Sequence, residues 1–210
     1  MFEGYDKLSV LSPVIGYDPE TKLFFMDDRT IGFGFVCDPI PGGGDELNTQ
    51  VQSFINLDFP EHTTISFMLY RSPDLDSQLD QVLTLRNGFY DQLLTPLLYQ
   101  RINFLREHSK KPLVTNYKGQ SYDCGLIVDI KLFITIKIPV RNGLAPTDNE
   151  KLEIIELQRR SYASLADTGF CPREMNASMY LRVMGTLINW QPDRSWEKSV
   201  IKPDPRSEEH

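Results

Sequence analysis

The sequence predicts an α+β fold in which a mainly antiparallel sheet is backed by amphipathic helices. Short runs of β-branched and aromatic residues alternate with polar turns near the N-terminus, and a strongly alternating run occupies residues 132–140. Elsewhere apolar residues recur at helical spacing. The length of 210 residues, 40% of them hydrophobic, is sufficient for one domain with a buried core.

Three short strands open the predicted fold. We expect them at residues 14–17, 23–26 and 31–36, with a polar hairpin turn at residues 27–29. In the third strand Gly32 and Gly34 alternate with apolar residues, which leaves one face of the strand bare. A bare strand face indicates close packing of another backbone or a bulge.

A glycine-rich break at residues 42–44 separates these strands from the first helix. Asp45 has the chemistry of an N-cap for a helix that begins at Glu46. Phe59 and Pro60 end that helix, because proline removes a backbone donor and clashes with the preceding turn.

The middle of the chain reads as one strand followed by two helices. Residues 63–70 are rich in β-branched and aromatic residues, and Pro73 opens the next helix. Gly88 separates that helix from a longer one at residues 89–108, in which Pro96 predicts a kink or a restart.

The third quarter of the chain contains the clearest strand and the clearest helix start. Residues 110–120 are polar and turn-like, and the alternating strand follows at residues 132–140. Thr147 and Glu150 have the spacing of a capping box, which predicts a helix that runs to Gly169. The last helix is expected to start near Pro172 and carries an apolar stripe.

The predicted domain organisation is simple. Residues 1–190 form a single α+β domain, and residues 191–210 form a polar, proline-containing linker because they lack periodicity.

Composition restricts the partners and the compartment. With 29 acidic and 22 basic residues, the net charge of -7 disfavours nucleic acid as the main partner. The sequence contains no apolar run long enough for a transmembrane segment and no signal peptide. Cys37, Cys124 and Cys171 are few and widely spaced, which favours reduced thiols in the cytoplasm. Of these, Cys37 and Cys171 read as small buried residues.

No motif in the sequence carries catalytic chemistry. A P-loop requires a glycine followed by lysine, and that dipeptide does not occur in the chain. His62, His108 and His210 are too scattered for a metal centre, and a nucleophile elbow is missing. The carboxylates at residues 74–80 and 150–156 are spaced for solvated helix faces. We therefore assign no catalytic, cofactor-binding or metal-binding residue.

One segment nevertheless resembles a known family. Residues 23–35 are similar to the early strand–turn–strand of the TraC proteins of F-type conjugation systems. In that family a small hydrophobic strand that ends in Ile-Pro follows, and here Ile40 and Pro41 match that end. Residues 132–138 resemble the family's isolated strand, and residues 177–192 resemble its helix and exit. The resemblance covers most of the chain in matching order.

The resemblance implies an N-terminal, non-hydrolytic domain of a type IV secretion ATPase. It implies a role in assembly, in self-association and in docking to secretion components, peripherally at the cytoplasmic face of a bacterial inner membrane. ATP and Mg²⁺ would then belong to a motor domain outside this chain, with residues 191–210 as the linker toward it. No direct contact with nucleic acid is implied.

The candidate interface residues are Gly32, Gly34, Trp190 and Trp196. The two glycines bare a strand face, and tryptophan is enriched at the centres of protein interfaces. Packing of the tryptophans back onto the domain is an equally good interpretation. Two other functions stay open, namely a small-molecule enzyme whose carboxylates meet only in the fold and a module that binds single-stranded nucleic acid.

Overall fold

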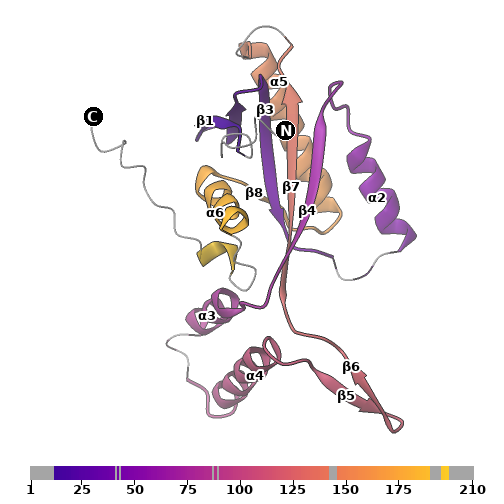
Figure 1. Cartoon of the computed structure of the whole chain (residues 1–210), viewed down its shortest axis with the longest axis vertical. Helices are drawn as coiled ribbons and strands as arrows, with labels where there is room; N and C mark the ends of the chain where they lie inside the picture. Colours follow the sequence, from indigo (N-terminus) through magenta and orange to yellow (C-terminus); the bar gives the residue numbers. More distant parts are fainter. Residues whose placement is uncertain are drawn as a thin grey trace, which may run out of the picture. The chain divides into compact units, whose positions relative to one another are not determined.

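Antiparallel strands and α-helices make up the chain, which confirms the predicted α+β class. The computed structural model describes residues 12–40, 42, 44–86, 88, 90–141, 146–189 and 195–198 (Figure 1). The chain folds as two compact units. Unit 1 comprises Met1–Tyr70 and Lys131–Tyr180, and unit 2 comprises Arg71–Ile130 and Leu181–His210. The single domain expected over residues 1–190 stays a prediction.

The main sheet forms the centre of unit 1. Its strands run in the order β1-β2-β3-β7-β4, and a short strand, β8, also pairs with β3. Their bounds are Val14–Asp18 for β1, Leu23–Met26 for β2, Thr30–Cys37 for β3, Thr64–Ser72 for β4, Asp129–Pro139 for β7 and Arg173–Glu174 for β8. The four longer strands expected from the sequence before residue 72 are confirmed within two residues. The two-residue β8 is too short to show a pattern.

The hairpin turns follow from local side-chain chemistry. Asp18 accepts hydrogen bonds from the Glu20 N–H and the Thr21 hydroxyl, which closes the turn between β1 and β2. Between β2 and β3, Arg29 takes a φ of 61° and the Thr30 hydroxyl donates to Asp28 at 2.6 Å. The predicted turn at residues 27–29 is confirmed.

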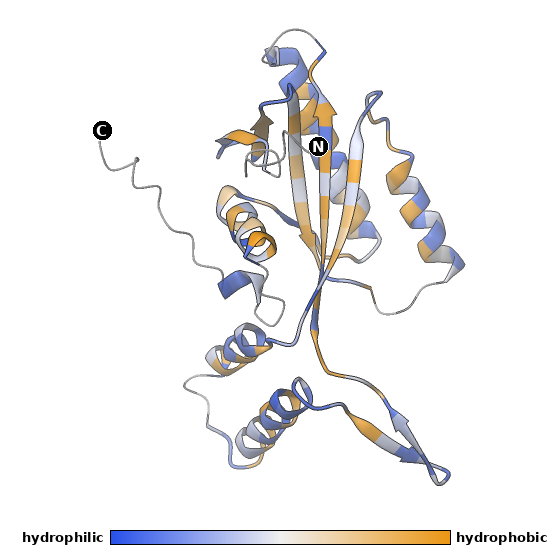
Figure 2. Cartoon of the chain, in the orientation of Figure 1, coloured by the Kyte–Doolittle hydropathy of each residue, from blue (hydrophilic) through white to orange (hydrophobic). Residues whose placement is uncertain are grey.

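The long pairing of β3 with β7 carries the core. It runs antiparallel from Thr30 opposite Pro139 to Cys37 opposite Leu132. Phe33 and Phe35 on β3, and Ile134 and Ile136 on β7, are buried on one face of the sheet. Both strands are largely apolar in Figure 2, as expected for central strands covered on this face.

Two helices of unit 1 cover that face. Helix α2 (Asp45–Ile55) contributes Phe54 to the core, and helix α5 (Asp148–Asp167) contributes Ile154 and Leu157. The prediction that Asp45 caps α2 is wrong, because Gly44 occupies the N-cap and Asp45 is the first helical residue. The helix also ends at Ile55, before the predicted stop at Phe59 and Pro60.

Helix α5 begins as the sequence predicts. The Thr147 hydroxyl accepts from the Glu150 N–H, and the Glu150 carboxylate accepts from the Thr147 N–H at 2.9 Å. This reciprocal box satisfies two backbone donors that the first helical turn leaves without partners. Gly169 follows the helix with a φ of 85°, which confirms the predicted C-terminal stop.

Helix α6 spans Ala177–Ile188 and thus starts five residues after the position predicted at Pro172. Residues 173–174 are extended instead, because they pair with β3 as β8. Asn176 then accepts a hydrogen bond from the Met179 N–H, which is the chemistry of an N-cap.

Unit 2 contains helices α3 (Asp76–Leu85) and α4 (Leu94–His108), strands β5 (Val114–Tyr117) and β6 (Gln120–Asp123), and the 3₁₀ turn η1 (Trp196–Lys198). Helix α3 starts three residues after Pro73. Helix α4 starts at Leu94 rather than at residue 89, so Pro96 falls in its first turn. Proline is tolerated there because the first helical N–H groups have no intrahelical partner.

The β5–β6 hairpin was not predicted, since the sequence indicated only a polar turn at residues 110–120. Lys118 and Gly119 both take positive φ angles, 49° and 80°, which is the conformation of a tight two-residue hairpin turn. All eight residues of the two strands are exposed, so the pattern of burial that normally marks a strand is missing here.

Candidate protein-interaction surfaces

The predicted glycine strip lies on the sheet face opposite α2 and α5. Gly32 pairs with Lys137 and Gly34 with Thr135 of β7. A Cβ atom at Gly32 would lie 2.9 Å from the Ile136 carbonyl oxygen and 2.7 Å from Met26 Cε. The predicted reason for the glycines, close approach of another backbone, therefore holds at Gly32.

The bare strip forms the floor of a shallow cavity of about 170 Å³. Its lining is mainly apolar, with Phe24 and Met26 on β2 and Met175 and Tyr180 after β8. The Tyr180 hydroxyl shares a hydrogen bond of 2.7 Å with the Ser12 hydroxyl, and its ring lies 5.3 Å from that of Phe24. The cavity is therefore small and apolar, and Lys137, which also lines it, forms an ion pair with Asp28.

Of the two tryptophans predicted to lie at an interface, the structure describes one. Trp190 lies outside the described residues. Trp196 is buried in η1, so the structure favours the interpretation in which its ring packs back onto the protein. Gly32 and Gly34 belong to unit 1, and Trp196 belongs to unit 2.

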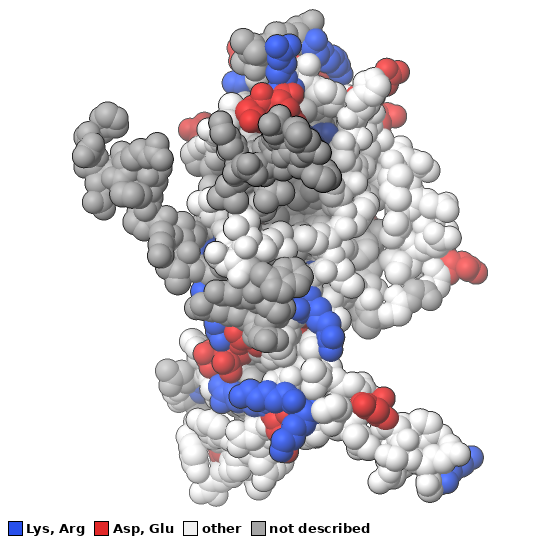
Figure 3. Space-filling view, viewed as in Figure 1, with Lys and Arg blue, Asp and Glu red and all other residues white. Residues whose placement is uncertain are grey.

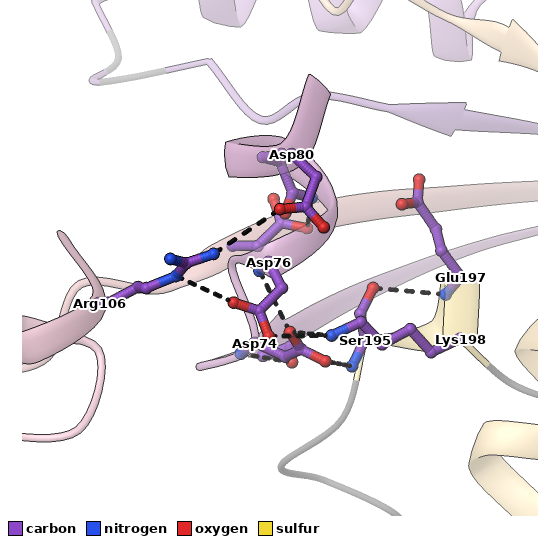
Figure 4. A network of polar contacts seen from close by, with 10 residues as sticks. Asp74, Asp76, Asp80, Arg106, Ser195, Glu197 and Lys198 are labelled. Carbon is purple, nitrogen blue, oxygen red and sulfur yellow. Dashed lines mark hydrogen bonds and ion pairs between the residues drawn. The ribbon is translucent and has the colours of Figure 1, made fainter. Parts of the chain in front are cut away.

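Polar contacts around Asp74 hold η1 in unit 2 (Figure 4). The Asp74 carboxylate accepts from Lys198 Nζ at 2.7 Å and from the Ser195 N–H at 3.1 Å. Asp76 accepts from Arg106 Nε at 3.3 Å, which links α3 to α4. We refer to these contacts of Asp74, Asp76, Arg106, Ser195 and Lys198 as the Asp74 network.

The Asp74 network corrects one expectation. Asp74 does not belong to a solvated helix face, since its side chain is largely buried and precedes α3. Burial alone would raise the pKa of Asp74, but the hydrogen bonds from Lys198, Ser195 and Asp76 outweigh it and hold that pKa below its ordinary value. Within the segment expected to be a linker, Trp196–Lys198 form a 3₁₀ turn, and the linker over residues 191–210 stays a prediction.

The second acidic cluster is also structural. Glu150 belongs to the capping box and in addition accepts from the Arg141 N–H, and these backbone donors hold its pKa below the ordinary value. Glu153 pairs with Arg141 at 3.1 Å, and Glu156 pairs with Arg159 at 2.8 Å. Glu150 thus serves as a cap, and Glu153 and Glu156 form ion pairs at the surface.

The cysteines divide between interior and surface. Cys37 is buried, and burial raises the pKa of its thiol to about 12, so it is an unreactive thiol. The expectation that Cys171 is buried is wrong. It is exposed with a φ of 45°, in the bend that leads from α5 to β8.

Several exposed apolar side chains of unit 2 lie on α3, on α4 and in the connection between them, and they were not singled out from the sequence. Leu85 is 82% exposed and Leu93 is 76% exposed, both near the connection between α3 and α4. We define the α3–α4 surface as the apolar residues that are at least two-fifths exposed there: Val82, Leu85, Tyr90, Leu93, Leu94, Leu97, Tyr99 and Phe104. Among the described residues of α4, Ile102 is the one that is buried.

Charged residues are mixed in sign over the described surface. On the face drawn in Figure 3, basic and acidic side chains lie near one another. Arg106, for example, contacts Asp76 and lies 3.6 Å from Asp80. Such pairing lowers the local potential that attracts a phosphate backbone.

The described residues offer neither a metal cluster nor a membrane span. They contain no group of three or more His, Cys, Asp or Glu side chains placed to hold a metal ion. Among the same residues, no helix is both long and apolar enough to pass through a bilayer.

The chain is similar to a known protein family. A family model described as TraC protein matches residues 8–209, which is nearly the whole chain. No curated protein and no solved structure matches this chain.

Proposed function

Because the chain belongs to the TraC family of conjugative type IV secretion proteins, we propose that it is an assembly and docking domain of the secretion ATPase. In this role it joins the ATPase to other secretion components at the cytoplasmic face of the inner membrane. It also contributes to self-association of the full-length ATPase. Nucleotide hydrolysis is assigned to a motor domain outside this chain, for which ATP and Mg²⁺ would be the cofactors.

The observation that carries the docking proposal is the α3–α4 surface. Eight apolar side chains, including Leu85 and Leu93, are open to solvent on two neighbouring segments of unit 2. Exposed apolar groups gain about 25 cal/mol for each Å² that a partner covers. Clusters of this kind on a soluble surface are typical of protein-interaction sites.

The composition of this surface favours a protein partner. Leucine provides apolar area, and tyrosine adds a hydroxyl that stays satisfied at the wet rim of an interface. Tyr90 and Tyr99 are both exposed, at 78% and 53%. The acidic net charge of the whole chain supports the same conclusion, because it opposes binding to DNA.

The docking proposal is tested in donor cells that carry the conjugation genes. Leu93→Glu combined with Leu97→Glu places two charges on the α3–α4 surface, where burial against a partner would then cost several kcal/mol. We expect DNA transfer to fall by at least about tenfold and site-specific photo-crosslinks from Tyr99 to inner-membrane secretion components to disappear.

The matched control is Leu152→Glu, an equally polar change on the exposed side of α5 in unit 1. It should leave transfer and crosslinks within about twofold of the wild type. Equal loss in both variants, or unchanged crosslinks in the double variant, would contradict docking through the α3–α4 surface.

The assignment of hydrolysis has its own test. The purified chain should turn over ATP no faster than a mock preparation. Turnover clearly above that background would refute the proposal that this chain is non-hydrolytic.

A further inference from the structure

Unit 1 contains a second cavity, of about 610 Å³, at the meeting point of three segments. It shares no lining residue with the cavity over the glycine strip or with the α3–α4 surface. The lining consists of residues 20–22 in the turn between β1 and β2, of Ile155, Gln158, Arg159 and Tyr162 on α5, and of residues 172–174 at β8.

Gln158 is the residue of this cavity that the fold does not explain. It lines the cavity although it is only 4% exposed. Among the described residues its carboxamide has no hydrogen-bond partner. Burial of an amide without a hydrogen bond is unfavourable, and nearly all buried polar groups in native proteins have a partner. We therefore expect a partner for Gln158 to reach it through the cavity.

The chemistry of the carboxamide matches the main chain of an extended peptide. The side chain of Gln158 offers a C=O acceptor beside an N–H donor. A peptide main chain offers the complementary groups, since each residue other than proline carries one N–H and one C=O. In antiparallel sheets two facing residues exchange both bonds in this way. One residue of an extended peptide can therefore satisfy the donor and the acceptor of Gln158 together.

The charges of the lining favour one carboxylate on that peptide. Three basic and two acidic residues line the cavity and give a net charge of +1, namely Lys22, Arg159, Arg173, Glu20 and Glu174. Lys22 pairs with Glu174, and Arg159 pairs with Glu156. Arg173 is exposed and forms no ion pair with the described residues. A guanidinium binds a carboxylate through two parallel hydrogen bonds, whereas a polyphosphate would meet the two glutamates of the lining.

Apolar area beside these groups can hold a neighbouring side chain of the peptide. Tyr162 lines the cavity and is 41% exposed, and its ring lies 6.3 Å from that of Phe35 in the core. Ile155 and Pro172 line the cavity as well. Side chains two positions apart in an extended peptide point to the same side, so an acidic and an apolar residue at that spacing can both face the cavity.

We propose that this cavity, the Gln158 site, binds an extended acidic peptide segment of a partner protein. The peptide main chain exchanges two hydrogen bonds with Gln158, its carboxylate pairs with Arg173, and an apolar side chain packs against Tyr162. The Gln158 site lies wholly in unit 1, so the proposal goes beyond docking through the α3–α4 surface and does not rest on it.

The first test titrates the ¹⁵N-labelled 210-residue chain with the peptide acetyl-Thr-Val-Glu-Val-Thr-amide and follows binding by NMR. The side-chain amide signals of Gln158, identified by their loss in Gln158→Leu, should shift and saturate. The same peptide with lysine in place of glutamate should bind at least about tenfold more weakly. Arg173→Gln should remove this preference, whereas the control Arg101→Gln, at an exposed position of α4, should keep it.

The second test separates a binding role of Gln158 from a structural one. Gln158→Leu replaces a carboxamide without a partner in the described chain by an apolar group of similar size, so the urea midpoint should stay the same or rise. Binding of the glutamate peptide should nevertheless fall at least about tenfold. Gln52→Leu, at an exposed position of α2, is the matched control and should change neither quantity.

Three results would overturn the peptide site. One is the absence of a saturable shift at Gln158 up to about 1 mM peptide, and another is equal affinity for the two peptides. The third is a lowered urea midpoint in Gln158→Leu, because the carboxamide would then be held by this chain. Leu93→Glu combined with Leu97→Glu should bind the glutamate peptide as the wild type does, so failure of the Gln158 site and failure of the α3–α4 surface are distinguishable.

Discussion

Helices α5 and α4 are the two longest among the described residues, and their apolar side chains differ in burial. Helix α5, with 20 residues, buries the apolar residues Ile154, Leu157 and Leu165 in the core and begins with a complete capping box. Helix α4, with 15 residues, buries only Ile102 among its described side chains, and its N-cap Leu93 offers no side-chain hydrogen bond. Tertiary packing supplies most helix stability in proteins, so α5 is held by the fold whereas α4 presents apolar area to solvent.

The largest loss of stability should follow from truncating a core side chain beneath α5. Phe35 is fully buried, with the Phe33 ring at 5.7 Å and the Tyr162 ring of α5 at 6.3 Å. Phe35→Ala should lower the free energy of unfolding by about 3–5 kcal/mol, because it removes buried area and leaves a cavity. Urea denaturation followed by circular dichroism measures the change. A loss below about 1 kcal/mol would mean that unit 1 is not organised around this residue.

A second, smaller effect is expected at the glycine strip. Gly32→Val places a branched side chain where even a Cβ atom is 2.9 Å from the Ile136 carbonyl oxygen. The strands must separate, at a cost of about 1–3 kcal/mol in the free energy of unfolding. Gly16→Val is the control, because a Cβ there meets Phe25 at an ordinary 3.8 Å. Equal denaturation midpoints for the two variants would show that the close approach is unimportant.

The Asp74 network gives a pH-dependent effect in unit 2. The pKa of Asp74 is lowered in the folded chain, so its contribution to stability is complete above the unfolded pKa and is lost as the pH falls through the folded value, below about pH 4. Asp74→Asn should cost about 1–2 kcal/mol at neutral pH and flatten the acid dependence.

Hydrogen exchange of residues 195–198 reports this effect directly, since η1 is the element that Asp74 holds. Protection there should fall in Asp74→Asn. In the control Asp80→Asn, whose carboxylate is largely exposed, protection should persist. Unchanged protection in Asp74→Asn would mean that burial of Trp196 alone retains the turn.

Much of unit 1 can be predicted because the residues that its sequence pattern marks as apolar faces are the ones that the fold buries. Strand β7 alternates over its length and is buried on the face that its even-numbered isoleucines indicate, and Thr147 with Glu150 caps α5 through bonds between neighbours in sequence. Both features depend on contacts that are local or periodic, so one sequence is sufficient to find them.

The features that could not be predicted depend on contacts between residues far apart in sequence, or on apolar side chains that no part of this chain covers. Asp74 meets Lys198, more than one hundred residues away, so its role has no local signature. The α3–α4 surface was missed for the opposite reason, because an apolar stripe at helical spacing indicates burial whether the cover is the same chain or a partner. Gly44 is the N-cap of α2 because Asp45 is already the first helical residue. Residue preferences at helix ends do not distinguish positions one residue apart.

The smallest expected effect on stability carries the most information about function. Leu97 on α4 is exposed, so Leu97→Gln should change the free energy of unfolding by less than about 0.5 kcal/mol. The same substitution removes apolar area from the α3–α4 surface and should weaken docking by several-fold in the crosslinking assay. Phe35→Ala gives the reverse pattern, since it destabilises the fold and leaves the α3–α4 surface chemically intact. If Leu97→Gln instead unfolds the chain, α4 is packed within this protein, and the contrast between α4 and α5 fails together with the docking proposal that rests on it.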